Sequence, residues 1–425
     1  MRLLPPSPPA ALPPSPPGSS PEASASGRRR RRAARRRARR LGLVAALAAL
    51  AVTAGLPAAS AGADEPAAPP AAGTAGVDAA TLAPGDLVSA VPQRFMPNPV
   101  TPSTARSWRI HYRSTTVTGK PNVVSGTVIV PSDGRTGKRP LVSYAVGTVG
   151  LADHCAPSRT FPSGLTKEGS LINQAVLRGW AVVVTDYEGL GTPGTHTYTV
   201  GPSAGHAVLD AARAAMRLPE AGISADSPVG VMGYSQGGQA SSWAAELHGS
   251  YAPELDVRGT ATGGVPRDLL EVAAHNEGKA GSGLIAMAAV GQDAAFPELD
   301  LDGYLNARGK LQKRIAETQC VELGAATWPF GRIDQITTRN PLAEPLWRDR
   351  LGRSTLGTTA PKAPVFLYHG SVDTLIPYSE GTSLRDAWRA RGADVTFRSL
   401  PFAHVSGAMA GSPLAMAWLA GRFGE

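Results

Sequence analysis

The feature that most constrains the fold is the pentapeptide Gly233-Tyr234-Ser235-Gln236-Gly237, which stands between an apolar run and a helical run. Residues 228–232 form a short apolar run, as expected of a buried strand, and residues 239–247 have helical periodicity. A glycine two positions before the serine and another two after it leave room for a sharp strand-to-helix turn. Such a turn is typical of a sheet of mostly parallel strands with helices on both faces.

The rest of the chain predicts the same α/β architecture. We predict strands at residues 107–113, 123–130, 140–146, 180–185, 257–261, 364–368 and 394–400, and helices at 171–178, 204–218, 284–290 and 380–389. The first two strands alternate like a half-buried antiparallel pair. Residues 266–345 interrupt the alternation of strands and helices, so we expect them to form a cap over the carboxyl end of the sheet.

The net charge of +9 is concentrated at the N-terminus. Residues 1–63 hold 11 of the 42 basic residues and one of the 33 acidic residues. The remainder of the chain is therefore nearly neutral, which argues against a basic surface for nucleic acid.

The N-terminal charge belongs to a pattern typical of secretory signals. An arginine-rich block ending at Arg40 leads into an apolar run of about 16 residues, and small residues follow at Ala59-Ser60-Ala61 and Ala61-Gly62-Ala63. We predict a signal peptide over residues 1–61 with cleavage at Ala61 or Ala63, a disordered leader over 62–90 and a folded domain over 91–425. The apolar run is shorter than the ~20 residues of a spanning helix, so we expect a secreted protein, with an uncleaved anchor as the alternative.

Ser235 needs a base and an acid that orients the base, because an unassisted serine is a weak nucleophile. In folds with this turn they follow the serine in the order acid, then histidine. Asp373 comes just after the predicted strand 364–368, and His404 follows the strand 394–400. His369 precedes the aspartate, so we expect it to pack beneath that loop. We predict Ser235, Asp373 and His404 as nucleophile, orienting acid and base.

An oxyanion formed at the substrate carbonyl needs two hydrogen-bond donors. The backbone N–H of Gln236, the residue after the nucleophile, is the first candidate. The second should come from the loop after residues 140–146, within Gly147-Thr148-Val149-Gly150, and we assign it to Thr148. The sequence contains neither zinc-binding spacing nor the full dinucleotide glycine pattern, so we predict no metal and no cofactor.

At these residues the chain resembles the secretory lipase family, whose best-known members are the fungal lipase A type enzymes. The resemblance lies in Gly147-Thr-Val-Gly150 with Cys155-Ala-Pro-Ser158, in Asp186-Tyr-Glu-Gly-Leu-Gly191, in the pentapeptide around Ser235, in Gly370-Ser-Val-Asp373 and in His404. It extends over about residues 95–420. One departure is that fungal members carry an acidic residue in the oxyanion loop, where this chain has Thr148 and Val149.

The resemblance implies an α/β-hydrolase core of eight strands, a helical cap inserted before Asp373, and an activity on acylglycerols or simpler carboxylic esters, encountered at a lipid–water interface. The sequence has two cysteines, Cys155 and Cys320, which by themselves are compatible with one bridge or with two free thiols. The resemblance implies that they pair. Residues 284–290 of the cap are candidates for lining an acyl-chain tunnel or for forming the cap core.

Two other interpretations remain open. A serine peptidase or a cell-wall acyl esterase on the same fold would carry the same three residues. A non-catalytic lipid- or carbohydrate-binding protein on a hydrolase scaffold is the alternative from another class.

Overall fold

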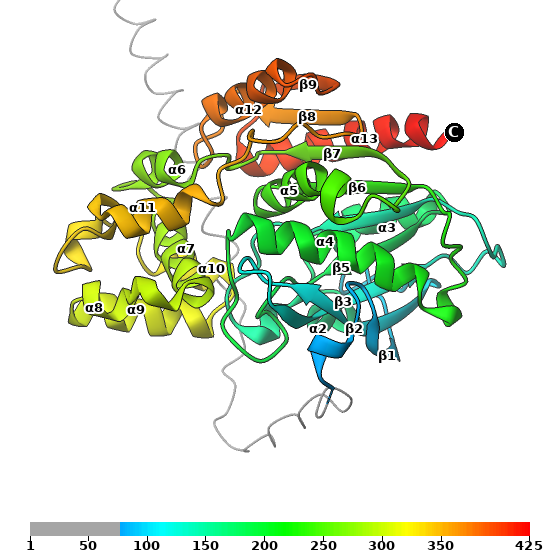
Figure 1. Cartoon of the computed structure of the whole chain (residues 1–425), viewed down its shortest axis with the longest axis horizontal. Helices are drawn as coiled ribbons and strands as arrows, with labels where there is room; N and C mark the ends of the chain where they lie inside the picture. Colours follow the sequence, from blue (N-terminus) through cyan, green and yellow to red (C-terminus); the bar gives the residue numbers. More distant parts are fainter. Residues whose placement is uncertain (1–76) are drawn as a thin grey trace, which may run out of the picture. The chain divides into compact units, whose positions relative to one another are not determined.

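The computed structural model describes residues 77–425 (Figure 1). The predicted signal peptide and most of the predicted leader lie outside the described residues. The first strand, β1 (Leu87–Gln93), begins inside the segment that the sequence assigned to the leader. Its mixed burial and its proline conceal the alternation from which a strand is normally recognised.

The described residues form one sheet of nine strands, in the order β1-β2-β3-β5-β4-β6-β7-β8-β9. The strands after β1 are β2 (Arg106–Thr115), β3 (Pro121–Val130), β4 (Leu141–Ala145), β5 (Ala181–Thr185), β6 (Val229–Tyr234), β7 (Val257–Gly263), β8 (Val365–Gly370) and β9 (Val395–Leu400). The pairs from β1 to β5 are antiparallel and those from β5 to β9 are parallel. The expected eight strands become nine because β1 adds an antiparallel edge.

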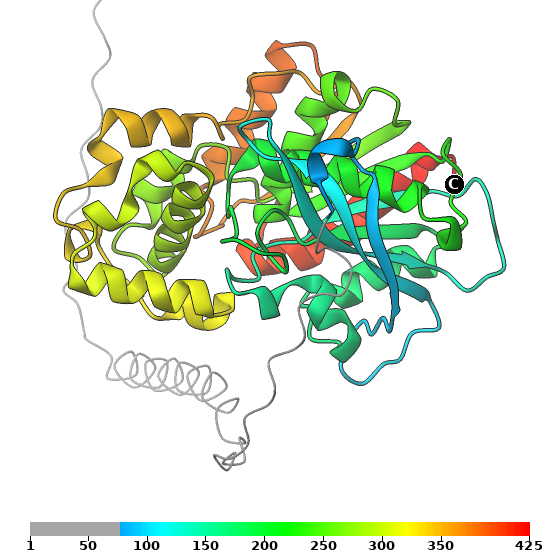
Figure 2. The same ribbon diagram turned by 60° about the horizontal axis from the view of Figure 1, so that its bottom comes forward.

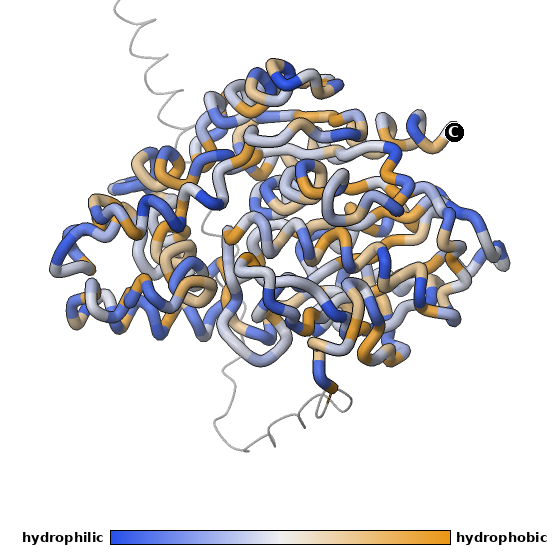
Figure 3. The backbone as a smooth tube through the Cα atoms, in the orientation of Figure 1, coloured by the Kyte–Doolittle hydropathy of each residue, from blue (hydrophilic) through white to orange (hydrophobic). Residues whose placement is uncertain are grey.

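Helices cover both faces of the sheet (Figures 1 and 2). One face carries α4 (Gly201–Met216), α5 (Gln236–Tyr251) and α12 (Tyr378–Ala390), and the other carries α3 (Gly169–Leu177) and α13 (His404–Phe423). Every residue of β4, β5 and β6 is buried, as expected of parallel strands covered on both sides. The hydropathy colouring in Figure 3 follows this arrangement, with apolar stretches along the strands.

The segment between β7 and β8 is helical. It contains α6 (Leu269–Asn276), α7 (Ser282–Ala295), α8 (Leu301–Tyr304), α9 (Ala307–Thr318), α10 (Val321–Ala326) and α11 (Pro345–Gly352). These helices gather beside the sheet (Figure 1) and form a second hydrophobic cluster around Met287 and Trp347, which Leu151 and Tyr198 join from outside the insert. We call residues 264–364 the insert. It is the helical insertion that the sequence predicts before Asp373, and it continues past residue 345.

Residues 77–425 include no helix that is both long enough and apolar enough to cross a membrane.

Candidate active site

Ser235 stands alone at the junction of β6 and α5, with φ 61° and ψ −121°. This backbone conformation is strained for a residue with a side chain, and it persists because the flanking elements fix it. A β-carbon at Gly233 would overlap the carbonyl oxygen of Gly237, and one at Gly237 would overlap that of Ala145. Both glycines are therefore required sterically.

The three residues predicted for acyl transfer lie together. His404 Nε2 is 2.8 Å from Ser235 Oγ, and His404 Nδ1 is 2.6 Å from Asp373 Oδ2. Asp373 comes from the loop after β8, and His404 is the first residue of α13. The carboxyl ends of β6, β8 and β9 meet at one edge of the sheet, which brings residues 169 positions apart into contact.

The surroundings of Asp373 fix the proton positions. Burial favours the neutral acid, but the hydrogen bond from His404 and the backbone N–H groups of Ile376 and Leu375, each 2.9 Å from Oδ1, outweigh it and lower the pKa of Asp373. An ionised carboxylate can only accept, so His404 Nδ1 carries the proton. His404 Nε2 is then free to accept the hydroxyl proton of Ser235.

His369 packs beneath the aspartate loop. Its side chain is buried, its Nε2 lies 3.0 Å from the carbonyl oxygen of Ile376, and burial lowers its pKa. It is 3.7 Å from Asp373 Oδ2, outside hydrogen-bond range. His404, not His369, is therefore the imidazole that joins Asp373 to Ser235.

Gln236 is the first residue of α5, so its N–H is one of the unpaired donors at a helix N-terminus. Its side-chain amide lies 3.0 Å from His196 Nε2, and His196 Nδ1 lies 2.9 Å from the carbonyl oxygen of Glu188. That carbonyl can only accept, so Nδ1 donates to it and Nε2 accepts from the amide. Burial lowers the pKa of His196 to about 4, in agreement with a neutral ring.

The predicted oxyanion loop, residues 147–150, passes beside Ser235. A β-carbon at Gly147 would lie 3.9 Å from Ser235 Cβ. The Gly147 N–H donates to the half-buried carboxyl of Glu168 over 2.6 Å, and Thr148 Oγ1 is 2.9 Å from the hydroxyl of Tyr198. The role of Thr148 as second donor stays a prediction.

Three side chains that hold these groups were missed from the sequence, namely His196, Tyr198 and Glu168. Each is a single residue of a common type outside any motif. They come near Ser235 only when the chain folds, so no sequence signal distinguishes them from ordinary core residues.

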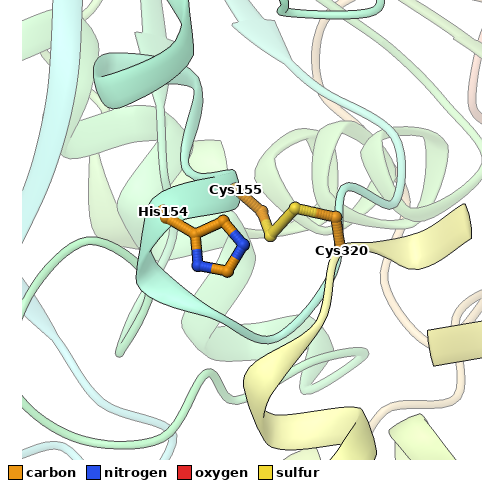
Figure 4. A group of neighbouring side chains, drawn as sticks. All are labelled: His154, Cys155 and Cys320. Carbon is orange, nitrogen blue, oxygen red and sulfur yellow. A yellow bond between two sulfur atoms is a disulfide. The ribbon is translucent and has the colours of Figure 1, made fainter. Parts of the chain in front are cut away.

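Cys155 and Cys320 form a disulfide between the core and the insert, across 165 positions of sequence. Figure 4 shows His154 beside it, and the His154 ring and the two sulfurs are the one potential metal-binding group within residues 77–425. Both sulfurs are engaged with each other, so neither is a thiolate ligand.

Ser235, Gln236 and His404 line an apolar cavity that they share with the insert. The insert contributes side chains of α7 and of its other segments, among them Leu284, Ile285, Ala286, Ala288, Ala289, Leu305, Ile336 and Trp347. Met287, in the same apolar stretch, is instead fully buried in the insert's core. The stretch 284–290 therefore both lines the cavity and fills the insert.

Glu380 makes stability depend on pH. Its side chain is 2% exposed and accepts the N–H of Asp268 over 2.7 Å, at the start of α6. Burial, reinforced by Asp268 and Glu271, raises its pKa to about 7. Between its ordinary pKa of about 4.5 and 7 the folded state binds more protons than the unfolded state, so stability falls as pH rises.

The wild type should lose on the order of 2 kcal/mol of its free energy of unfolding between pH 5 and pH 8 because Glu380 ionises. We expect Glu380→Gln to abolish this loss, since glutamine does not titrate. Urea unfolding of the wild type and the variant at both pH values measures it. Glu220→Gln, at an exposed site, is the control. The prediction would be wrong if the free energies of unfolding of the wild type and of Glu380→Gln differed by the same amount at both pH values.

Comparisons with known proteins identify the family and the fold of the chain. The secretory lipase family profile matches residues 156–425. A probable inactive lipase of Mycobacterium tuberculosis is 32% identical, over 77% of this chain and 75% of its own length. A secreted triacylglycerol lipase of Malassezia globosa is 26% identical, over 81% of this chain and 76% of its own.

Among solved structures, the closed state of Candida antarctica lipase A superposes with a TM-score of 0.73 at 24% identity, covering 81% of this chain and 83% of that one. This similarity supports the α/β-hydrolase fold. The match to the family profile spans more than half of the chain, and the mycobacterial relative exceeds 30% identity. The chain therefore belongs to the secretory lipase family.

Proposed function

We propose that this protein is an exported serine ester hydrolase of the triacylglycerol lipase type. The observation that carries the proposal is the pair of hydrogen bonds at His404, whose Nε2 accepts from Ser235 Oγ over 2.8 Å and whose Nδ1 donates to Asp373 Oδ2 over 2.6 Å. The name of the family, the secreted relatives and the predicted signal peptide support export.

The reaction is a two-step acyl transfer to water. Ser235 Oγ attacks the ester carbonyl while His404 Nε2 takes the hydroxyl proton, and Asp373 stabilises the imidazolium. The Gln236 N–H and a second donor in the oxyanion loop, which we assign to Thr148, bind the tetrahedral oxyanion. The alcohol leaves with the proton from His404. Water then attacks the acyl-enzyme, with His404 as base, and releases the acid and Ser235.

The cavity supports an apolar acyl group as substrate. Its lining from α7 is aliphatic, and a hydrocarbon chain gains about 0.8 kcal/mol for each methylene that it buries. An ester with a medium or long acyl chain fits this lining better than a charged peptide does.

The test combines labelling with a substrate series on the mature protein. We expect a fluorophosphonate probe to label Ser235, as located by peptide mass spectrometry, and tributyrin and p-nitrophenyl esters to be hydrolysed. An aminoacyl amide tests the peptidase alternative, and faster cleavage of the amide would replace the lipase proposal. Absence of labelling would favour the non-catalytic binding protein, a relevant outcome because one relative is named a probable inactive lipase.

Filling the cavity should shift the acyl-chain preference. Ala286 lines the cavity and packs with Trp328 and Ile336 inside the insert. We expect Ala286→Leu to lower kcat/KM for p-nitrophenyl decanoate by roughly tenfold, while the butyrate ester changes less than threefold, because only the longer chain needs that space. Ala326→Leu, on the exposed side of α10, is the control. An equal effect on both esters would show that the acyl chain does not reach Ala286.

A further inference from the structure

We propose that the insert sets the position of the oxyanion loop, with Cys320 and Val321 acting as positioning residues for the acyl-transfer reaction. The inference rests on the proposed function and adds a role for α10, a helix of the insert. It starts from the contacts between α10 and residues 147–150.

The insert contacts this loop through its backbone. The N–H of Val321 donates to the carbonyl oxygen of Val149 over 2.9 Å, and Gly150 forms an antiparallel bridge with Cys320. Gly150 has φ 129°, and a β-carbon there would lie 2.5 Å from Cys320 Cα. The two backbones are therefore in close contact, which only glycine permits.

The opposite side of the same loop is held by the core. The Gly147 N–H donates to Glu168 over 2.6 Å, and Thr148 Oγ1 lies 2.9 Å from the Tyr198 hydroxyl. Glu168 is itself fixed by the hydroxyl of Tyr144, which donates to it over 2.6 Å. The loop is thus held between two supports, of which the second belongs to the insert.

The disulfide fastens this second support. Cys155 lies five residues beyond Gly150, and its partner Cys320 is the N-cap of α10, directly before Val321. An ion pair of 2.5 Å between Lys167 and Glu322 also joins the core to α10, but both side chains are largely exposed, so its contribution is small. The covalent bond therefore holds the start of α10 beside the loop.

This arrangement has a catalytic consequence. An oxyanion donor acts only where it meets the developing charge at hydrogen-bond distance, and a misplacement of about 1 Å can cost on the order of 10²-fold in rate. Displacing the insert side of the loop should therefore lower kcat. It should leave KM nearly unchanged, since the apolar cavity that binds the acyl chain is lined by other residues.

Val321→Pro removes the one N–H that bonds to Val149 and keeps the disulfide. Val321 is the first residue of α10, where proline is tolerated, and Cys320 has φ −74° and ψ 165°, as a residue before proline requires. Val321→Ala is the conservative variant, because it shortens the side chain and keeps the N–H. Ala307→Pro is the matched control, at the first position of α9 after the extended Asn306.

We expect Val321→Pro to lower kcat for p-nitrophenyl butyrate about tenfold with KM within twofold, and to slow phosphonylation of Ser235 by a similar factor. Val321→Ala and Ala307→Pro should stay within twofold of the wild type. Circular dichroism and thermal melting establish that each variant is folded. If a folded Val321→Pro variant had the same kcat as Val321→Ala, the inference would be overturned and the proposed function would stand.

A double variant covers the case in which Val321→Pro does not fold. Cys155→Ala with Cys320→Ala removes the covalent link, and below its melting temperature we expect the same loss in kcat. Wild-type kcat in this folded double variant would then overturn the inference. A wild type that is neither labelled at Ser235 nor active would instead overturn the proposed function, and the inference with it.

Discussion

Ser235→Ala is expected to lower kcat for tributyrin and p-nitrophenyl butyrate by about 10⁵-fold, the largest effect of any single change in this chain. In the proposed mechanism the hydroxyl forms the acyl-enzyme, and no other oxygen of the described residues hydrogen-bonds to His404 Nε2. Labelling by the fluorophosphonate probe should disappear with the activity. Initial rates with purified protein, together with in-gel fluorescence, measure both.

Ser250→Ala is the control for Ser235→Ala. Ser250 lies near the end of α5, is exposed, and donates only to the carbonyl oxygen of Leu247. It should leave rate and labelling unchanged. Retention of more than about 1% of wild-type kcat in Ser235→Ala, after exclusion of contaminating esterase, would remove Ser235 from the mechanism.

Asp373→Asn is expected to lower kcat by about 10³- to 10⁴-fold and to change KM less than threefold. The asparagine oxygen can still accept the N–H groups of Leu375 and Ile376, so the loop should keep its shape. The amide nitrogen, however, presents a donor to His404 Nδ1. The imidazole then carries its proton on Nε2, where it can no longer accept from Ser235. Steady-state kinetics at pH 8 measures the loss.

The double variant Ser235→Ala/Asp373→Asn tests whether the two residues act as a unit. Its residual rate should equal that of Ser235→Ala alone, because Asp373 acts only through His404 on the serine. Asp386→Asn, at a carboxylate with an exposed side chain, should behave as wild type. If the double variant had a kcat lower than that of Ser235→Ala, Asp373 would contribute to the rate independently of Ser235.

The sequence predicted eight of the nine strands of the described residues but only five of their twelve α-helices. The strand β1 was missed because its burial does not alternate, and the helix α13, which begins at His404, was not among the predicted helices. That helix is rich in glycine and alanine and contains Pro413, so the helical periodicity of its apolar residues is weak. Central strands such as β5 were found because a β-branched run buried on both faces has few alternatives.

The candidate site was predictable where chain order and local sterics determine it. Ser235, Asp373 and His404 could be selected because each follows a recognisable strand. The groups that orient them could not, since Glu168, His196 and Tyr198 acquire their partners only when distant segments meet. The resemblance to a family implied the pairing of Cys155 with Cys320, which spacing alone left open.

By itself the sequence determined the nucleophile turn, because two glycines around Ser235 are a steric requirement of a strand-to-helix junction and act within five residues. It also determined the order of Ser235, Asp373 and His404, which the parallel strands convert into neighbours at one sheet edge. Only the tertiary structure decided which nitrogen of each histidine ring carries the proton, which groups hold the oxyanion loop, and which side chains of the insert face the cavity. These depend on hydrogen bonds and packing between segments far apart in the chain, whose free energies no local pattern encodes.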